Sequence, residues 1–182
     1  MSAASQPSAS RAGQAIGSMI FSVAGAAWLV AWCIQAYGAN AGILFLIAAG
    51  AIALFLLSLR QFRQNQSAHA AESGSEEDKK TSRIFNIVNI VQGVAILVAW
   101  NVVVNLGHRE WFVPAFIFIV GAHFIPLGLV FRTVRHYLIG AAMMLLAVLY
   151  PFIAKGGPSD PVGCLGAGIL LWAFSAAVLI PA

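Results

Sequence analysis

The sequence predicts an all-α integral membrane protein with six transmembrane helices arranged as three antiparallel hairpins. Two observations predict this class: 60% of the 182 residues are hydrophobic, and only 9% are charged, with the charges lying between long apolar runs. Ten basic and six acidic side chains are too few to cover a soluble core with polar surface. Because bilayer hydrocarbon offers the backbone no hydrogen bonds, apolar runs of about 20 residues are typical of membrane-spanning helices.

The predicted spans follow one another along the chain, mostly with short connections, so successive spans are antiparallel. They cover residues 15–37, 41–62, 84–106, 111–131, 136–154 and 161–181. A polar tail (1–14) precedes the first span, which is too long for a cleaved signal peptide. Between the second and third spans, residues 64–82 include no apolar residue larger than alanine and are expected to form a flexible cytoplasmic loop. The hairpins are therefore 15–63, 83–132 and 133–182, within one membrane domain.

The basic residues indicate the orientation of the spans. With a cytoplasmic N-terminus, the cytoplasmic segments contain eight of the ten Lys and Arg residues, and the outer segments contain only Arg109 and Lys155. This asymmetry follows the positive-inside rule. We therefore predict a multi-pass protein of the cell (inner) membrane with both termini cytoplasmic.

The isoelectric point of about 9.5 does not indicate nucleic-acid binding. The basic residues flank apolar spans and do not form a patch interleaved with aromatic residues, which nucleic-acid binding would need. Nucleic acid is therefore excluded as a partner, and membrane lipids are expected instead.

Polar side chains are concentrated in the third predicted span. Asn86, Asn89 and Gln92 follow one another at intervals of three residues. At about 100° per residue they occupy an arc of about 120° on one face of the helix. Since an amide at membrane depth costs free energy unless it is hydrogen bonded, this face is a candidate binding site for a small polar ligand.

The fourth span has a histidine close to a proline, in the stretch GAHFIPLG. Gln92 lies about 13 Å and His123 about 12 Å from the cytoplasmic ends of their helices, so antiparallel neighbours bring them to one depth. Pro126 cannot donate to the carbonyl of Ala122, so we expect a helix kink there, which Gly121 makes easier. The sequence thus predicts a polar crevice formed by His123 and the three amides. The alternative is that His123 only joins two helices by a hydrogen bond.

A second polar group is predicted at the outer end of the same hairpin. Its members come from the end of the third span and the turn that follows: Asn101, Asn105, His108, Arg109 and Glu110. The group is placed to contact a headgroup or a substrate, and a solvated turn is the alternative. At the cytoplasmic end, Arg132, Arg135 and His136 are interpreted first as topology signals and then as anionic-lipid contacts.

Cysteines and small residues bear on how the helices are joined. Cys33 ends the first span and Cys164 begins the sixth, so a disulfide between them near the outer face is a candidate. A free cysteine is equally an ordinary small apolar residue. Small residues four apart, such as Gly163 and Ala167, allow helices to approach closely within a subunit. Because six short helices enclose little volume, we also expect a homo-oligomer.

Motifs of known enzyme chemistry do not occur in the sequence. There is no HExxH, GxSxG or P-loop, and no pair of carboxylates within a span. The four histidines are predicted at four different depths, which disfavours a haem held by two of them. We therefore predict no catalytic residue, no metal and no cofactor.

Two main functions stay open at this point, and a membrane-embedded enzyme that uses His108 or His123 is a third, less favoured alternative. The first is an intramembrane polar crevice that binds or passes a small polar solute, an ion or a lipid headgroup. Because the sequence has no ATP site, such a transporter or channel would be passive or gradient-driven. The second is a non-transporting membrane protein that binds lipids or partner proteins through helix packing.

Overall fold

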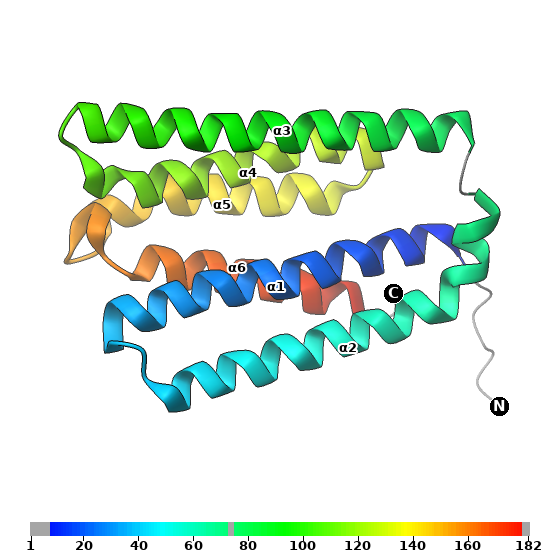
Figure 1. The fold of residues 1–182 in the computed structure, drawn as a ribbon, viewed down its shortest axis with the longest axis horizontal. Helices are drawn as coiled ribbons and strands as arrows, with labels where there is room; N and C mark the ends of the chain where they lie inside the picture. Colours follow the sequence, from blue (N-terminus) through cyan, green and yellow to red (C-terminus); the bar gives the residue numbers. More distant parts are fainter. Residues whose placement is uncertain (1–7, 73–74, 180–182) are drawn as a thin grey trace.

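The part of the chain that the structure describes folds into six long α-helices joined by short turns (Figure 1). The computed structural model describes residues 8–72 and 75–179. The helices are α1 (Ala9–Tyr37), α2 (Ala41–Glu72), α3 (Glu76–Asn105), α4 (Phe112–Phe131), α5 (Val134–Ile153) and α6 (Val162–Leu179). Two 3₁₀ helices, η1 (Arg109–Trp111) and η2 (Gly157–Ser159), precede α4 and α6. The described ranges contain no β-strand, so the predicted all-α class is confirmed.

Each of the six α-helices is long and apolar enough to cross a membrane. This agrees with the six predicted spans and is consistent with a multi-pass membrane protein. The grouping into three hairpins and the orientation across the membrane stay predictions.

Two polar segments are more helical than predicted. α1 begins at Ala9, inside the predicted tail. α2 continues to Glu72 and α3 begins at Glu76, so helix covers most of the predicted flexible loop. Ala, Gln, Glu and Lys are strong helix formers, and these segments prolong helices that the apolar spans have already nucleated. The rest of the predicted tail (1–7), residues 73–74 and the end of the sixth predicted span (180–181) lie outside the described residues.

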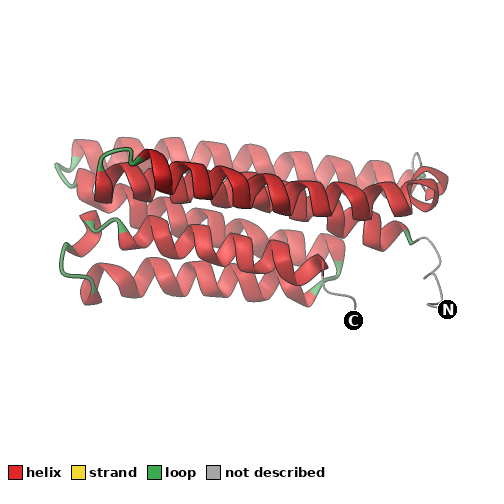
Figure 2. Cartoon of the chain, turned by 90° about the horizontal axis from the view of Figure 1, so that it is seen from below, coloured by secondary structure: helices red, strands yellow, loops and turns green. Residues whose placement is uncertain are grey.

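The helices run side by side along the long axis, so the turns gather at two ends (Figures 1 and 2). The start of α1, the α2–α3 connection and the α4–α5 turn lie at one of them (Figure 1). We call it the basic end, because most basic residues lie in these segments or in the adjoining parts of α2 and α3: Arg11, Arg60, Arg63, Lys79, Lys80, Arg83, Arg132 and Arg135. The α1–α2, α3–α4 and α5–α6 turns form the opposite end.

Contacts between the helices follow the order α2–α1–α6–α5–α4–α3. The most extensive contacts join α1 to α2, α1 to α6, and α4 to α5. α2 and α3, although consecutive in the chain, lie at the two edges of the molecule (Figure 1). α3 packs mainly on α4, and no residue in its most apolar segment is fully buried. α3 is therefore the helix that the rest of the chain covers least.

Two glycine pairs mark the closest approaches between helices. A Cβ on Gly121 of α4 would lie 2.9 Å from the carbonyl oxygen of Gly140 on α5, and one on Gly140 would lie 2.8 Å from that of Gly121. Gly25 of α1 and Gly168 of α6 are related in the same way, at 3.1 and 3.0 Å. A side chain at these positions would push the helices apart. Small residues therefore serve packing within one subunit.

Candidate functional site

His123 lies in the half of α4 nearest the basic end, with its ring towards α3 and α5. The imidazole interacts with the backbone of Val88 on α3 and electrostatically with His136 on α5. Its Nδ1 atom is buried and has no hydrogen-bond partner in the described part of the chain. Since buried polar atoms in proteins almost always have a partner, this nitrogen is the first candidate for a ligand contact.

Aromatic rings connect His123 with the basic end of the molecule. The ring centroids of His123 and Phe124 are 5.5 Å apart, and those of Phe124 and His136 are 6.2 Å apart. His136 then stacks on Phe131, the last residue of α4, at 5.6 Å and 23°. The Nδ1 of His136 is hydrogen bonded to the Thr133 hydroxyl. The two histidines thus belong to one row of rings that leads from the helix end into the apolar interior.

The three amides predicted beside His123 lie on different parts of α3. Gln92 is half-buried, and it lies one turn from Val88, which packs against the core. Asn86 and Asn89 are exposed. Within the described ranges, none of the three side chains forms a hydrogen bond. Gln92 therefore lies on the face of α3 that contacts α4, whereas a joint site of all three amides with His123 stays a prediction.

The two residues predicted to bend α4 have different surroundings. α4 continues as an α-helix through Pro126 to Phe131, and the expected kink at the proline stays a prediction. Gly121 lies at the crossing with α5, so close packing explains the absence of a side chain there. Close packing against α5 requires a glycine at position 121 whether or not α4 bends.

Unpaired polar groups also occur at the basic end. Arg83 and Arg132 are exposed, and Arg135 is half-buried with an Nη1 atom that has no hydrogen-bond partner. None of the three forms an ion pair with another described residue. The Oε1 atom of Gln61 on α2 is buried and unpaired as well. The three buried unpaired atoms, on Gln61, His123 and Arg135, all lie in the half of the molecule nearest the basic end.

The structure brings together only part of the polar group predicted at the end opposite the basic end. The Nδ1 of His108 lies 3.1 Å from the Oε1 of Glu110, within the turn between α3 and α4. Arg109 beside them is exposed. Asn101 and Asn105 are exposed on the side of α3 away from α4, and the Asn101 amide donates to the Leu97 carbonyl at 2.8 Å. These two amides therefore face outward from the molecule.

Both cysteines are free thiols, and the candidate disulfide is absent from the structure. Cys33 donates to the carbonyl of Asn40 at 3.9 Å, whereas the side-chain amide of Gln35 donates to the sulfur of Cys164 at 3.5 Å. Both thiols are buried, and each has its own polar contact. The residues act here as small groups in the α1–α6 region.

A polar cluster that the sequence did not predict joins α1, α2 and α6. The Ser18 hydroxyl donates to the carbonyl of Ser175 at 3.0 Å, and it lies 2.7 Å from the Ser58 hydroxyl and 2.8 Å from the Ser175 hydroxyl. Ser175 in turn reaches the Ser18 carbonyl at 3.0 Å, and Ser58 donates to that of Leu54 at 2.7 Å. Three isolated serines in apolar runs carry no signal of this shared contact. Because the hydroxyls are paired, the cluster is a packing device with no free group for a ligand.

The described residues contain no group of three or more His, Cys, Asp or Glu side chains that could hold a metal ion. The fold is thus that of a candidate multi-pass membrane protein in which, among the described residues, the unpaired buried polar atoms lie in one half. Compared with known proteins, the chain matches no family model, no curated protein and no solved structure.

Proposed function

We propose that the protein binds the headgroup of an anionic membrane lipid at its basic end. In this proposal the protein resides in the cell (inner) membrane, and the basic end and both termini are cytoplasmic, as the distribution of Lys and Arg predicts. The observation that carries the proposal is the set of buried atoms without partners, on Gln61, His123 and Arg135, all in the basic half. A ligand that offers both donors and acceptors beside α4 and α5 would satisfy the atoms on His123 and Arg135, whereas Gln61 lies apart on α2 and would meet a separate lipid.

The charges at the basic end support an anionic ligand. Arg83, Arg132 and Arg135 lack a carboxylate partner among the described residues, whereas Glu76 pairs with Lys79 at 2.7 Å. A guanidinium group binds a phosphate through two parallel hydrogen bonds. Each Lys or Arg near an anionic leaflet contributes about 1 kcal/mol of attraction. The phosphate of the lipid would therefore lie beside Arg132 and Arg135.

The position of His123 fits the part of a lipid below its phosphate. His123 is eight residues from Phe131, or about 12 Å along the helix, which is too deep for the phosphate itself. The glycerol and ester oxygens of a phospholipid lie deeper than its phosphate. The Nε2–H of His136, whose Nδ1 is hydrogen bonded to Thr133, would donate to these oxygens, which would otherwise lack a donor in hydrocarbon. The Nδ1 of His123, whose ring already interacts with the Val88 backbone, would accept from a lipid hydroxyl.

Passage of a solute past His123 has less support. Two grooves of the described structure lie on the outer face of α3 and in the half of α2 nearest the basic end, and His123 lines neither. The α2 groove has Arg60 and Arg63 beside Leu56 and Leu59, which again suits a phosphate above an acyl chain.

Native mass spectrometry of the protein from membranes tests the proposal. We expect retained phospholipid that is predominantly anionic. The double variant Arg132→Gln, Arg135→Gln should bind that lipid about 30-fold more weakly, since two basic residues contribute about 2 kcal/mol. Arg109→Gln, at the opposite end, is the matched control and should retain it. Equal retention in the double variant, or equal loss in the control, would contradict the proposal.

His123→Leu separates ligand binding from packing at the deeper position. If His123 contacts lipid, this variant loses lipid affinity while its thermal stability in lipid-free detergent stays that of the wild type. If the histidine only joins helices, the stability falls without any change in lipid affinity per folded molecule. The second result would remove His123 from the site and leave the arginines to be judged by the first experiment.

A further inference from the structure

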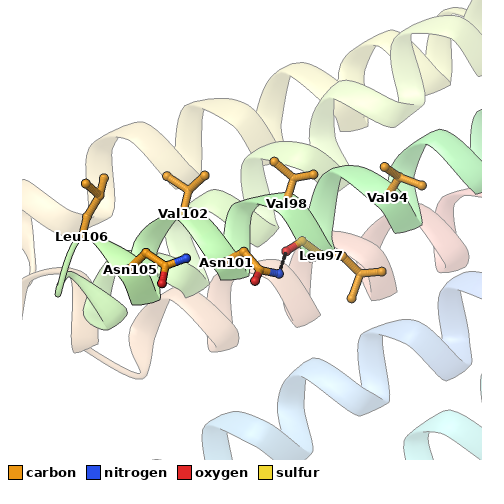
Figure 3. A pocket seen from close by; sticks show the side chains of 7 residues that line it. All are labelled: Val94, Leu97, Val98, Asn101, Val102, Asn105 and Leu106. Atoms are coloured by element: carbon orange, nitrogen blue, oxygen red, sulfur yellow. Dashed lines mark hydrogen bonds between the residues drawn. The ribbon is translucent and has the colours of Figure 1, made fainter.

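The outer face of α3 has a groove with two polar residues in it (Figure 3). Seven side chains from this one helix line it: Val94, Leu97, Val98, Asn101, Val102, Asn105 and Leu106. Figure 3 shows two rows, one of three valines ending in Leu106, and one that begins at Leu97 and continues with the two asparagines. The groove is therefore the space between neighbouring ridges of a single exposed helix, which is the shape that a second helix fills.

The spacing of the exposed residues on this face is that of a helix–helix interface. Ile87, Val91, Val94, Val98, Asn101 and Asn105 follow one another at alternating intervals of four and three residues. At about 100° per residue these six residues, which we call the α3 seam, lie within an arc of about 80°. The four apolar members are 51%, 60%, 54% and 55% exposed, so nothing in the described part of the chain covers them.

Because of the two asparagines, acyl chains are an unfavourable environment for the α3 seam. Asn101 is five residues, or about 7 Å, inside the end of the apolar run at Leu106, at a depth where acyl chains offer no hydrogen bonds. Its only described side-chain hydrogen bond is to its own helix, which leaves the amide oxygen unpaired. Asn105 has no side-chain hydrogen bond to any described residue. Amides in this position bond across helices in membranes.

A second copy of the chain supplies matching amides at matching depths. Two copies inserted in the same direction are related by a two-fold axis along the membrane normal, so their α3 helices run parallel. Each seam residue then meets its own counterpart, and Asn101 faces Asn101 of the other copy. A carboxamide is both donor and acceptor, so the pair is self-complementary. Valine and isoleucine have few rotamers to lose in the contact. We infer that the protein forms a two-fold dimer through the α3 seam.

Disulfide cross-linking of the full-length protein in liposomes tests this interface. Val98→Cys places a thiol on the seam, and Leu57→Cys, which replaces an α2 residue that is 52% exposed, is the matched control. The native thiols, Cys33 and Cys164, are buried, and the wild-type protein measures their background. We expect a dimer band for Val98→Cys at high dilution in lipid and none for Leu57→Cys. Asn101→Val added to Val98→Cys should weaken association about tenfold.

Counting subunits by single-molecule photobleaching in the same liposomes completes the test. Two bleaching steps for the wild type, and one for Asn101→Val at the same dilution, are the expected result. Single steps at every protein density, three or more steps, cross-linking of Leu57→Cys in place of Val98→Cys, or cross-linking in cells to a different protein would each overturn the proposal. Because Asn101 is exposed, its replacement leaves intramolecular packing intact, and an unchanged melting temperature checks this.

Discussion

Ser18 and His123 show two outcomes for a polar side chain within an apolar helix. Ser18 has acceptor and donor partners on α2 and α6, so its hydroxyl costs nothing in the interior. The Nδ1 of His123 is just as hidden from solvent and has no partner among the described residues. The first arrangement fixes helices relative to one another, and the second leaves an unpaired group, which we propose contacts a lipid.

Replacement of Ser18 by alanine should therefore destabilise the fold. The variant removes the central hydroxyl, which contacts both other serines, and we expect the free energy of unfolding to fall by about 1–2 kcal/mol. Ser58→Ala should cost less, because only one interhelical contact is lost. Ser67→Ala, at an exposed position of α2, is the control. Reversible unfolding in mixed micelles measures the three values, and a Ser18→Ala value equal to that of the control would show that the cluster does not hold the helices.

At the scale of elements, the α4–α5 contact depends on two glycines facing each other. We predict that Gly140→Ala lowers the free energy of unfolding by about 1–3 kcal/mol, because its Cβ meets the Gly121 carbonyl at 2.8 Å and the Cβ of Phe124 at 3.2 Å. Gly93→Ala on α3 has no atom within 4 Å and should be neutral or slightly stabilising. Thermal unfolding of both variants in detergent compares them. Equal effects would mean that α4 and α5 do not approach this closely.

The elements could be predicted from the sequence, and most of their contacts could not. Six apolar runs define helices, because hydrocarbon allows no other backbone arrangement for a single crossing segment. The same runs do not reveal that α1 packs on α6, since lipid and a neighbouring helix are equally apolar to a leucine. For the same reason, the sequence around Ser58 and Ser175 does not indicate that both residues contact Ser18. The three-residue spacing places Gln92, Asn86 and Asn89 on one arc of the helix. Of these three, only Gln92 is half-buried, and this depends on tertiary packing, which the spacing does not show.

At the scale of the molecule, α6 joins the α1–α2 pair to the α5–α4–α3 part. Trp172 of α6 lies against both Gly25 of α1 and Gly50 of α2, where added Cβ atoms would be 2.4 and 2.7 Å from its ring. Its indole N–H donates to the Ser22 carbonyl at 2.9 Å. The first and last helices are thus held together by packing and hydrogen bonds across nearly the whole sequence. By contrast, α2 and α3 are joined by the chain connection between them and make at most slight contact with each other.

Cutting the chain between α2 and α3 should therefore leave the molecule assembled. We propose inserting a protease site between Ala71 and Ser75 and cleaving the folded protein in detergent. The α1–α2 fragment should still co-purify with the α3–α6 fragment, because the α1–α6 contact joins them. Gly168→Leu should separate the cleaved fragments, since a Cβ there already meets Leu29 at 2.6 Å. Gly13→Leu, at an exposed site on α1 with no atom within 4 Å, should not. Dissociation of the cleaved wild type would mean that the α2–α3 connection, and not the α1–α6 contact, holds the two parts together.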